Sequence, residues 1–91
     1  MIHMLVRNRV HDFDRWKRVF DSQFGRAQAA GLTVVHLWTS IDDRNNVFFL
    51  LEVADIDRAK VFLNAPESAE AGKTSGVIDG EYHFLQDGET N

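Results

Sequence analysis

The chain has 91 residues, which is enough for one domain with a modest hydrophobic core. Hydrophobic residues make up 44% and charged residues 26%, as in an ordinary globular protein, and the formal net charge is −4. A negatively charged domain is a poor general binder of nucleic acid, because that binding depends on lysine and arginine side chains that neutralise phosphates. The chain has no cysteine, so disulfides, thiolate metal sites and thiol catalysis are excluded.

The first half of the chain predicts a strand, a helix and two further strands. Apolar residues alternate along residues 2–10, and this period of two is typical of a strand. Asp12 is the predicted N-cap of a helix in which aromatic residues recur at helical spacing, and Gly31 is its predicted end. Residues 32–41 form the second predicted strand, and a polar turn separates it from a third strand over residues 47–54.

The second half predicts one more helix and one more strand. Asp55 is expected to cap the second helix, which Pro66 interrupts because proline lacks an N–H group. A short further helical turn is expected over residues 67–73, and Gly76 ends it. Residues 77–85 form the fourth predicted strand.

The element order β-α-β-β-α-β predicts a ferredoxin-like α+β fold. Its four-stranded antiparallel sheet has the order 4-1-3-2, with two helices on one face. We expect a single domain over residues 1–86 and a polar C-terminal tail over residues 87–91. No stretch approaches 18 apolar residues, so we expect no membrane partner. Because residues 1–10 lack the pattern of a signal peptide, we expect a cytoplasmic protein.

Both faces of the predicted sheet are apolar. Strand alternation turns one set of residues toward the helices: Ile2, Met4, Val6, Val35, Leu37, Phe49, Leu51, Val53, Ile78, Tyr82 and Phe84. The opposite face then carries Leu5, Val34, Trp38, Phe48, Leu50 and Leu85. An exposed apolar patch of this extent is unusual on a monomer, and the sequence offers no further element to cover it. We therefore predict a homodimer in which two sheets pack face to face into an α+β barrel.

The polar residues of this second face are candidates for chemistry. Alternation and strand direction predict a row of four side chains, His83–His3–Glu52–His36, at one end of the sheet. Such a row suits proton transfer or metal binding. The alternative is that each histidine is a half-buried strand residue paired with a carboxylate or with water. Because no metal-binding spacing motif is present, we predict no metal site.

Two arginines also lie on the second face of the predicted sheet. Arg7 and Arg9 each need a carboxylate there, and Glu52, Glu81 or an acidic ligand would serve. Asp79 and Glu81 have the spacing of paired carboxylates, and we expect them to form salt bridges or to face solvent.

Several segments together resemble a known superfamily. They are Val10 to Lys17 at the head of the first helix, the turn Asp42 to Asn45, the break Ala65-Pro66-Glu67, Gly76-Val77, and Tyr82 to Leu85. With these segments the chain resembles the dimeric α+β barrel superfamily, and within it the small stand-alone proteins grouped with antibiotic biosynthesis monooxygenase-like domains. That superfamily includes cofactor-independent oxygenases of aromatic polyketides, haem-degrading enzymes, lactone isomerases and members without a known activity.

The resemblance implies a small homodimeric enzyme, a monooxygenase or an isomerase, that acts on an apolar or aromatic small molecule without a cofactor. The expected catalytic residues are His36, His83, Asn8 and Arg9, and the expected substrate contacts are Trp38, His3, Glu52 and Phe48. The alternative is a non-catalytic barrel that binds a small molecule or serves as an accessory protein. In that case Trp38 and Phe48 only fill the dimer interface.

The sequence argues against two other kinds of protein with this architecture, haem-degrading enzymes and RNA-recognition domains. Haem-degrading relatives pair a strand asparagine, which Asn8 matches, with a helical tryptophan and histidine, but Phe62 and Gly72 stand at those two positions. The RNA-recognition fold has the same element order, but it requires a basic-Gly-aromatic signature in its third strand. Residues 46–50 lack that signature, so we expect no nucleic-acid partner.

Overall fold

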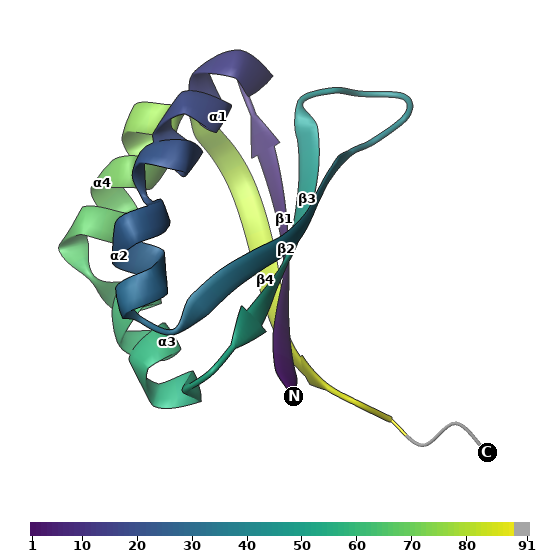
Figure 1. Cartoon of the computed structure of the whole chain (residues 1–91). Coiled ribbons are helices and arrows are strands. Elements are labelled where there is room, and N and C mark those ends of the chain that lie inside the picture. The colour runs from purple at the N-terminus through teal and green to yellow at the C-terminus, as the bar shows by residue number, and fades with distance from the viewer. Residues whose placement is uncertain (89–91) are drawn as a thin grey trace.

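The computed structural model describes residues 1–88 and has one sheet with helices on one side (Figure 1). Its elements are β1 (Ile2–Val10), α1 (Phe13–Ser22), α2 (Phe24–Ala29), β2 (Leu32–Thr39), β3 (Asn46–Val53), α3 (Ile56–Asn64), α4 (Pro66–Ser75) and β4 (Val77–Gln86). Neighbouring strands are antiparallel in the order β2-β3-β1-β4. The predicted fold class and strand order are therefore confirmed. The last part of the predicted polar tail, residues 89–91, lies outside the described residues.

Each of the two predicted helical segments is divided into two helices. The Asp12 carboxylate accepts a hydrogen bond from the Arg15 backbone N–H at 3.0 Å, so it caps α1 as predicted. Asp55 caps α3 in the same way. Pro66 begins α4, which is a full helix and longer than the short turn we expected. The break at Gln23 between α1 and α2 was not predicted.

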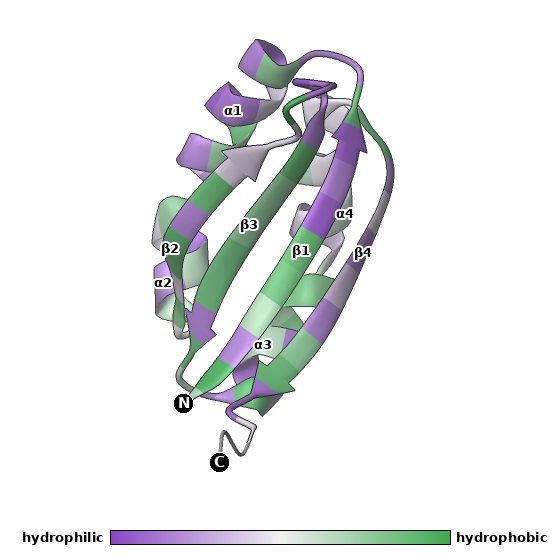
Figure 2. Cartoon of the chain, turned by 90° about the vertical axis from the view of Figure 1, so that its right-hand side faces the viewer, coloured by the Kyte–Doolittle hydropathy of each residue, from purple (hydrophilic) through white to green (hydrophobic). Residues whose placement is uncertain are grey.

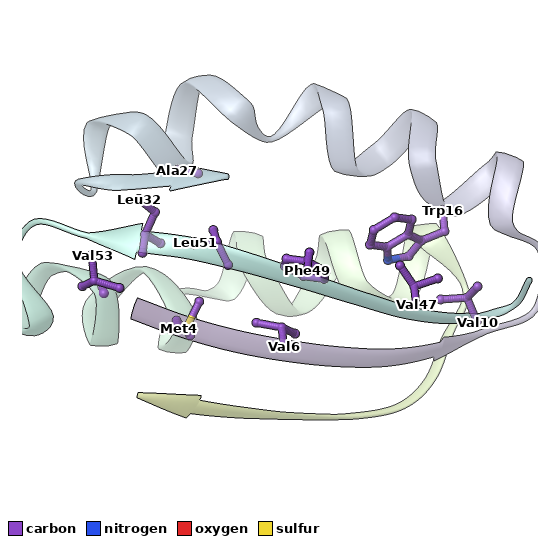
Figure 3. Close-up of a cluster of buried hydrophobic side chains, with 11 residues drawn as sticks. Met4, Val6, Val10, Trp16, Ala27, Leu32, Val47, Phe49, Leu51 and Val53 are labelled. Atoms are coloured by element: carbon purple, nitrogen blue, oxygen red, sulfur yellow. The ribbon is translucent and has the colours of Figure 1, made fainter. Parts of the chain in front are cut away.

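The core lies between the helices and the sheet (Figure 3). Trp16 on α1 is 3% exposed and stacks on Phe20, with 4.6 Å between the ring centroids. It also packs at 5.7 Å against Phe49 on β3. Five predicted helix-facing residues are buried, which confirms the assignment for the two central strands: Met4, Val6, Phe49, Leu51 and Val53.

The predicted faces are wrong at the centre of β2. The pairing with β3 shifts between Val34 and His36, so Val35 has no partner there. Val34 lies opposite Leu51 and packs against the core, whereas Val35 is 37% exposed. The physical reason is a β-bulge, which inserts one residue into a strand and reverses the alternation on one side of it.

A second bulge corrects the predicted face of Ile78. Val77 pairs with Val10 and Asp79 pairs with Arg9, which leaves Ile78 between them without a partner. Ile78 is 47% exposed, and Val77 takes the helix-facing position in its place. Downstream of the bulge, β4 follows the predicted alternation.

The sheet face away from the helices is not covered by any segment of residues 1–88 (Figure 2). On this open sheet face β3 is coloured hydrophobic along most of its length. Trp38 is 47% exposed and Leu85 is 44% exposed, and both lie on this face. Within residues 1–88 no helix is long and apolar enough to cross a membrane.

Candidate functional site

A cavity of about 310 Å³ lies between the helices and the sheet. Most of its lining is apolar, and its aromatic side chains come from α1, α2, α3 and the sheet: Trp16, Phe20, Phe24, Phe49, Phe62 and Tyr82. This volume is near the lower end of the range for pockets that hold small organic ligands. The helix-to-sheet cavity is therefore the first candidate for a binding site.

The cavity exists because α4 presents small residues to the sheet. Ser68, Ala71, Gly72 and Ser75 recur at the i, i+3, i+4, i+7 spacing of one helix face, and all four line the cavity. Such short side chains leave the space in front of β4 unfilled. Tyr82 on β4 is consequently 50% exposed although it points to the helix side.

One wall of the cavity carries an amide beside a glycine. Asn8 on β1 lies opposite Gly80 on β4. A Cβ atom added at Gly80 would lie 2.5 Å from the Asn8 Oδ1 atom, so only glycine leaves room for the amide in this position. The amide can both donate and accept a hydrogen bond, and Tyr82, two residues after Gly80 on β4, also lines the cavity.

Arg26 lies beside the cavity and contacts three residues that line it. The Arg26 guanidinium donates to Gln23 Oε1 at 2.6 Å and to Ser68 Oγ at 3.4 Å. Its central carbon also lies 4.9 Å from the centroid of the Phe62 ring. Arg26 therefore connects α2 with α3 and α4 at the edge of the cavity. We assign these contacts a role in packing the helices and not in binding a ligand.

The sheet separates the predicted catalytic residues into two groups. Asn8 lines the cavity on the helix side. The other three predicted catalytic residues lie on the open sheet face: Arg9, His36 and His83. A single small ligand cannot contact side chains on both faces of one sheet, so the four residues do not form one site within one chain.

The predicted row of three histidines and Glu52 is wrong. His3 lies opposite Glu52 as predicted, but His36 and His83 lie in the next row, with two leucine side chains between them. The strand registers differ by two residues from those that the predicted row requires. No group of three or more potential metal-ligating side chains is gathered within the part of the chain that the structure describes.

The predicted aromatic contacts lie together on the open sheet face. Trp38 on β2 lies opposite Phe48 on β3. The His36 ring stacks on the Trp38 indole, with 5.0 Å between the centroids and 20° between the planes. These three ring side chains lie side by side on the open sheet face, and they take no part in the lining of the cavity.

An ion cluster accompanies this aromatic surface. Arg7 donates to Glu81 at 2.9 Å and to Asp79 at 3.2 Å, which confirms that Arg7 has carboxylate partners and that Asp79 and Glu81 form salt bridges. His83 Nε2 lies 3.2 Å from the other oxygen of Glu81. The hydrogen bond from Arg7 lowers the pKa of Glu81 below its ordinary value.

The lowered pKa of Glu81 predicts a pH-dependent contribution to stability. A carboxyl group whose pKa is lower in the folded state stabilises the fold at pH values above its ordinary pKa of 4.5, and the contribution disappears as pH falls through the lowered value. We expect Glu81→Gln to lower Tm slightly at pH 7, and the deficit should shrink steadily as the pH is lowered below 4.5. The exposed loop variant Asp42→Asn is the control. A deficit of equal size at every pH, measured by thermal unfolding, would contradict this.

Sequence reasoning missed most of the cavity residues. Strand alternation predicts Tyr82 as a helix-facing core residue, and it predicts no functional role for Gly80. The small residues of α4 at helical spacing were the available signal, because such a face cannot fill the space above a sheet. Asn8 was the one cavity residue among the predicted site residues.

Comparison with known proteins identifies the fold. No family model matches the chain, and no curated protein matches it significantly. A solved structure from Bordetella bronchiseptica, provisionally described as an antibiotic biosynthesis monooxygenase, superposes with a TM-score of 0.78 at 16% identity, over 97% of each chain. The chain has the antibiotic biosynthesis monooxygenase fold.

Two further solved structures have a similar fold. One from Caulobacter crescentus with the same provisional description has a TM-score of 0.74 at 18% identity, and the match covers 97% of this chain and 90% of that one. An uncharacterised NIPSNAP domain protein from Burkholderia xenovorans has a TM-score of 0.69 at 12% identity, over 97% and 94% of the two chains. At these identities the likeness confirms the resemblance at the level of the fold.

Proposed function

We propose that this chain is a monooxygenase-like enzyme that binds a flat apolar or aromatic small molecule in the helix-to-sheet cavity and oxidises it with O₂ without a cofactor. The observation that carries the proposal is an aromatic-lined cavity of about 310 Å³ with Asn8 and Tyr82 on its β1–β4 wall. Apolar walls with a few placed polar groups are typical of small-molecule sites. Structures with the same fold that are described as antibiotic biosynthesis monooxygenases support the reaction class.

The chemistry requires a substrate that is itself acidic at carbon. A methylene group between two aromatic rings loses a proton to water, and the carbanion adds O₂ to form a peroxide anion. The peroxide takes up a proton and loses water, so R₂CH₂ and O₂ become R₂C=O and H₂O. An amide donor such as Asn8 stabilises negative charge that develops on a substrate oxygen during the first step. Apolar walls keep bulk water from solvating the carbanion after a single water molecule has taken the proton.

The proposed enzyme is a homodimer that assembles through the open sheet face. Large apolar side chains from all four strands lie on that face: Leu5, Trp38, Phe48, Leu50 and Leu85. Covering them with the same face of a second copy removes both apolar surfaces from water at once. The cavities then lie on the outer, helix-covered sides, so each copy keeps a complete site.

A non-catalytic binding protein is the second candidate function. Among residues 1–88, the acidic residue at the cavity is Glu81, whose carboxylate pairs with Arg7 on the open sheet face. No histidine, aspartate or lysine of the described residues lines the cavity, so no side chain of that kind is placed to remove a substrate proton. This composition favours a carrier of apolar molecules as the alternative.

Oxygen uptake with 1,8-dihydroxyanthrone, a flat tricyclic compound with an acidic methylene group, tests the proposal. We expect saturable binding, measured by quenching of tryptophan fluorescence, and one O₂ consumed for each quinone formed. The rate should exceed autoxidation with heat-denatured protein by at least about tenfold. Binding without O₂ uptake would establish the carrier instead. Absence of binding to this probe would contradict both candidates for this class of ligand.

A further inference from the structure

β4 is the wall that the cavity shares with the open sheet face. Because side chains alternate along a strand, Gly80 and Tyr82 line the cavity while Asp79 and Glu81 point to the other side. β4 is an edge strand that pairs only with β1 within the described sheet, and most of its side chains are exposed. Beyond its ladder with β1 and the core contacts of Val77 and Phe84, this wall has few buried side chains to fix its position.

Arg7 supplies the contacts that packing does not. It lies on β1 directly opposite Glu81, and its side chain is 28% exposed. Its three guanidinium nitrogens reach Glu81 at 2.9 Å, Asp79 at 3.2 Å and the Asn46 amide oxygen at 3.3 Å. Asn46 belongs to β3, so a single side chain on β1 ties the cavity wall to the strand beyond it. A planar guanidinium with several fixed donors suits this bridging role, and an ammonium group does not.

We propose that Arg7 and Glu81 are positioning residues for the cavity, and that their ion pair on the open sheet face holds β4 where Gly80 leaves room for the Asn8 amide. The inference rests on the proposed binding of a small molecule in the cavity. Glu81 is among the residues that line the cavity, but its carboxylate pairs with Arg7 on the open sheet face, so the pair acts through the backbone of β4. Asn8 follows Arg7 directly, and Gly80 precedes Glu81, so a change in the pairing of Arg7 with Glu81 moves the polar wall.

Arg9 provides a matched control for Arg7. It lies on the same strand and on the same face, and it pairs across the sheet with Asp79. Its side chain is 55% exposed, and its closest carboxylate oxygen is 4.0 Å away. A weak, solvated contact of this kind contributes little to the position of β4. Removing the charge of Arg9 therefore changes the net charge as much as removing that of Arg7, but it leaves the position of β4 unchanged.

Binding of 1,8-dihydroxyanthrone to Arg7→Met, Glu81→Gln, their double variant and Arg9→Met tests the inference. We expect Arg7→Met and Glu81→Gln each to raise Kd about tenfold, and the double variant to be no worse than either one. Arg9→Met should stay within about twofold of the unmodified protein. Arg7→Lys should recover only part of the affinity, because lysine cannot bridge the three partners in the same geometry.

A ligand-independent measurement makes the test decisive. Tyr82 is the single tyrosine of the chain, so 3-fluorotyrosine gives one fluorine resonance that reports on the cavity wall. We expect this resonance to shift in Arg7→Met and in Glu81→Gln but not in Arg9→Met. An unchanged resonance in both Arg7→Met and Glu81→Gln would overturn the inference, as would additive effects of the two substitutions on Kd. If the unmodified protein does not bind the probe, the proposed function fails for that ligand, and the resonance still decides the role of Arg7. If Arg7→Met does not fold, the resonance of the isosteric variant Glu81→Gln tests the same role of the ion pair.

Discussion

Replacing Gly80 by alanine is expected to weaken the binding of a flat aromatic ligand about 100-fold while the protein remains folded. The new Cβ atom would lie 2.5 Å from Asn8 Oδ1 and 3.0 Å from the Arg7 backbone oxygen. The backbone oxygen belongs to the strand ladder and cannot move far, so the Asn8 amide must leave its position. The ligand then loses a hydrogen-bonding partner, and the displaced amide occupies part of the cavity.

Two further variants separate these two effects. Asn8→Ala removes the amide without narrowing the cavity, and we expect it to raise Kd about tenfold. Combining it with Gly80→Ala removes the closer of the two atoms that the new methyl would meet and leaves the 3.0 Å contact with the Arg7 backbone oxygen, so the double variant should bind much more tightly than Gly80→Ala alone. Gly25→Ala is the control, because a Cβ atom there meets no other atom within 4 Å. A folded Gly80→Ala protein that binds as tightly as the unmodified one would rule out this site.

The sequence predicted the fold because its local signals agree with one another. β1 and the central part of β3 pair without a bulge, so the period of two assigns their faces correctly, and Asp12, Asp55 and Pro66 mark helix ends where the structure has them. The errors at Val35 and Ile78 have one cause. A bulge depends on how a strand pairs with its neighbour, and no residue type in these segments predicts it.

The candidate site was harder to predict than the fold. Polar residues on an apolar face, such as His36 and His83, are easily recognised in a sequence. For this reason the sequence predicts a site on the open sheet face. A cavity forms where side chains are too small to fill the space. Gly72 on α4 lines the cavity, but in the sequence alone it reads only as a residue of low helix propensity. The predicted histidine row also depended on exact strand registers, and a shift of two residues separated its members.

Placing a carboxylate at Phe48 is expected to convert the proposed homodimer into a monomer. Phe48 lies on β3, between Trp38 on β2 and Arg7 on β1, near the middle of the open sheet face. In the proposed dimer this position is covered by the same face of the second copy. Arg7 already pairs with Glu81 and Asp79, so a new aspartate there lacks a free cationic partner within this cluster and is buried at a large cost. We expect Phe48→Asp to raise the dimer dissociation constant at least about 100-fold.

Sedimentation equilibrium over a range of protein concentrations measures this change. Val61→Asp is the control, because Val61 is 72% exposed on α3, away from the sheet. It adds the same charge at an exposed apolar position, and the dimer should be unaffected. In the monomer Phe48 is partly exposed, so Phe48→Asp should keep the circular dichroism spectrum of the unmodified protein. If the unmodified chain sediments as a monomer at every concentration, the proposed assembly is wrong. If the dimer survives Phe48→Asp, it assembles through another surface, and the open sheet face must then be covered by a different partner.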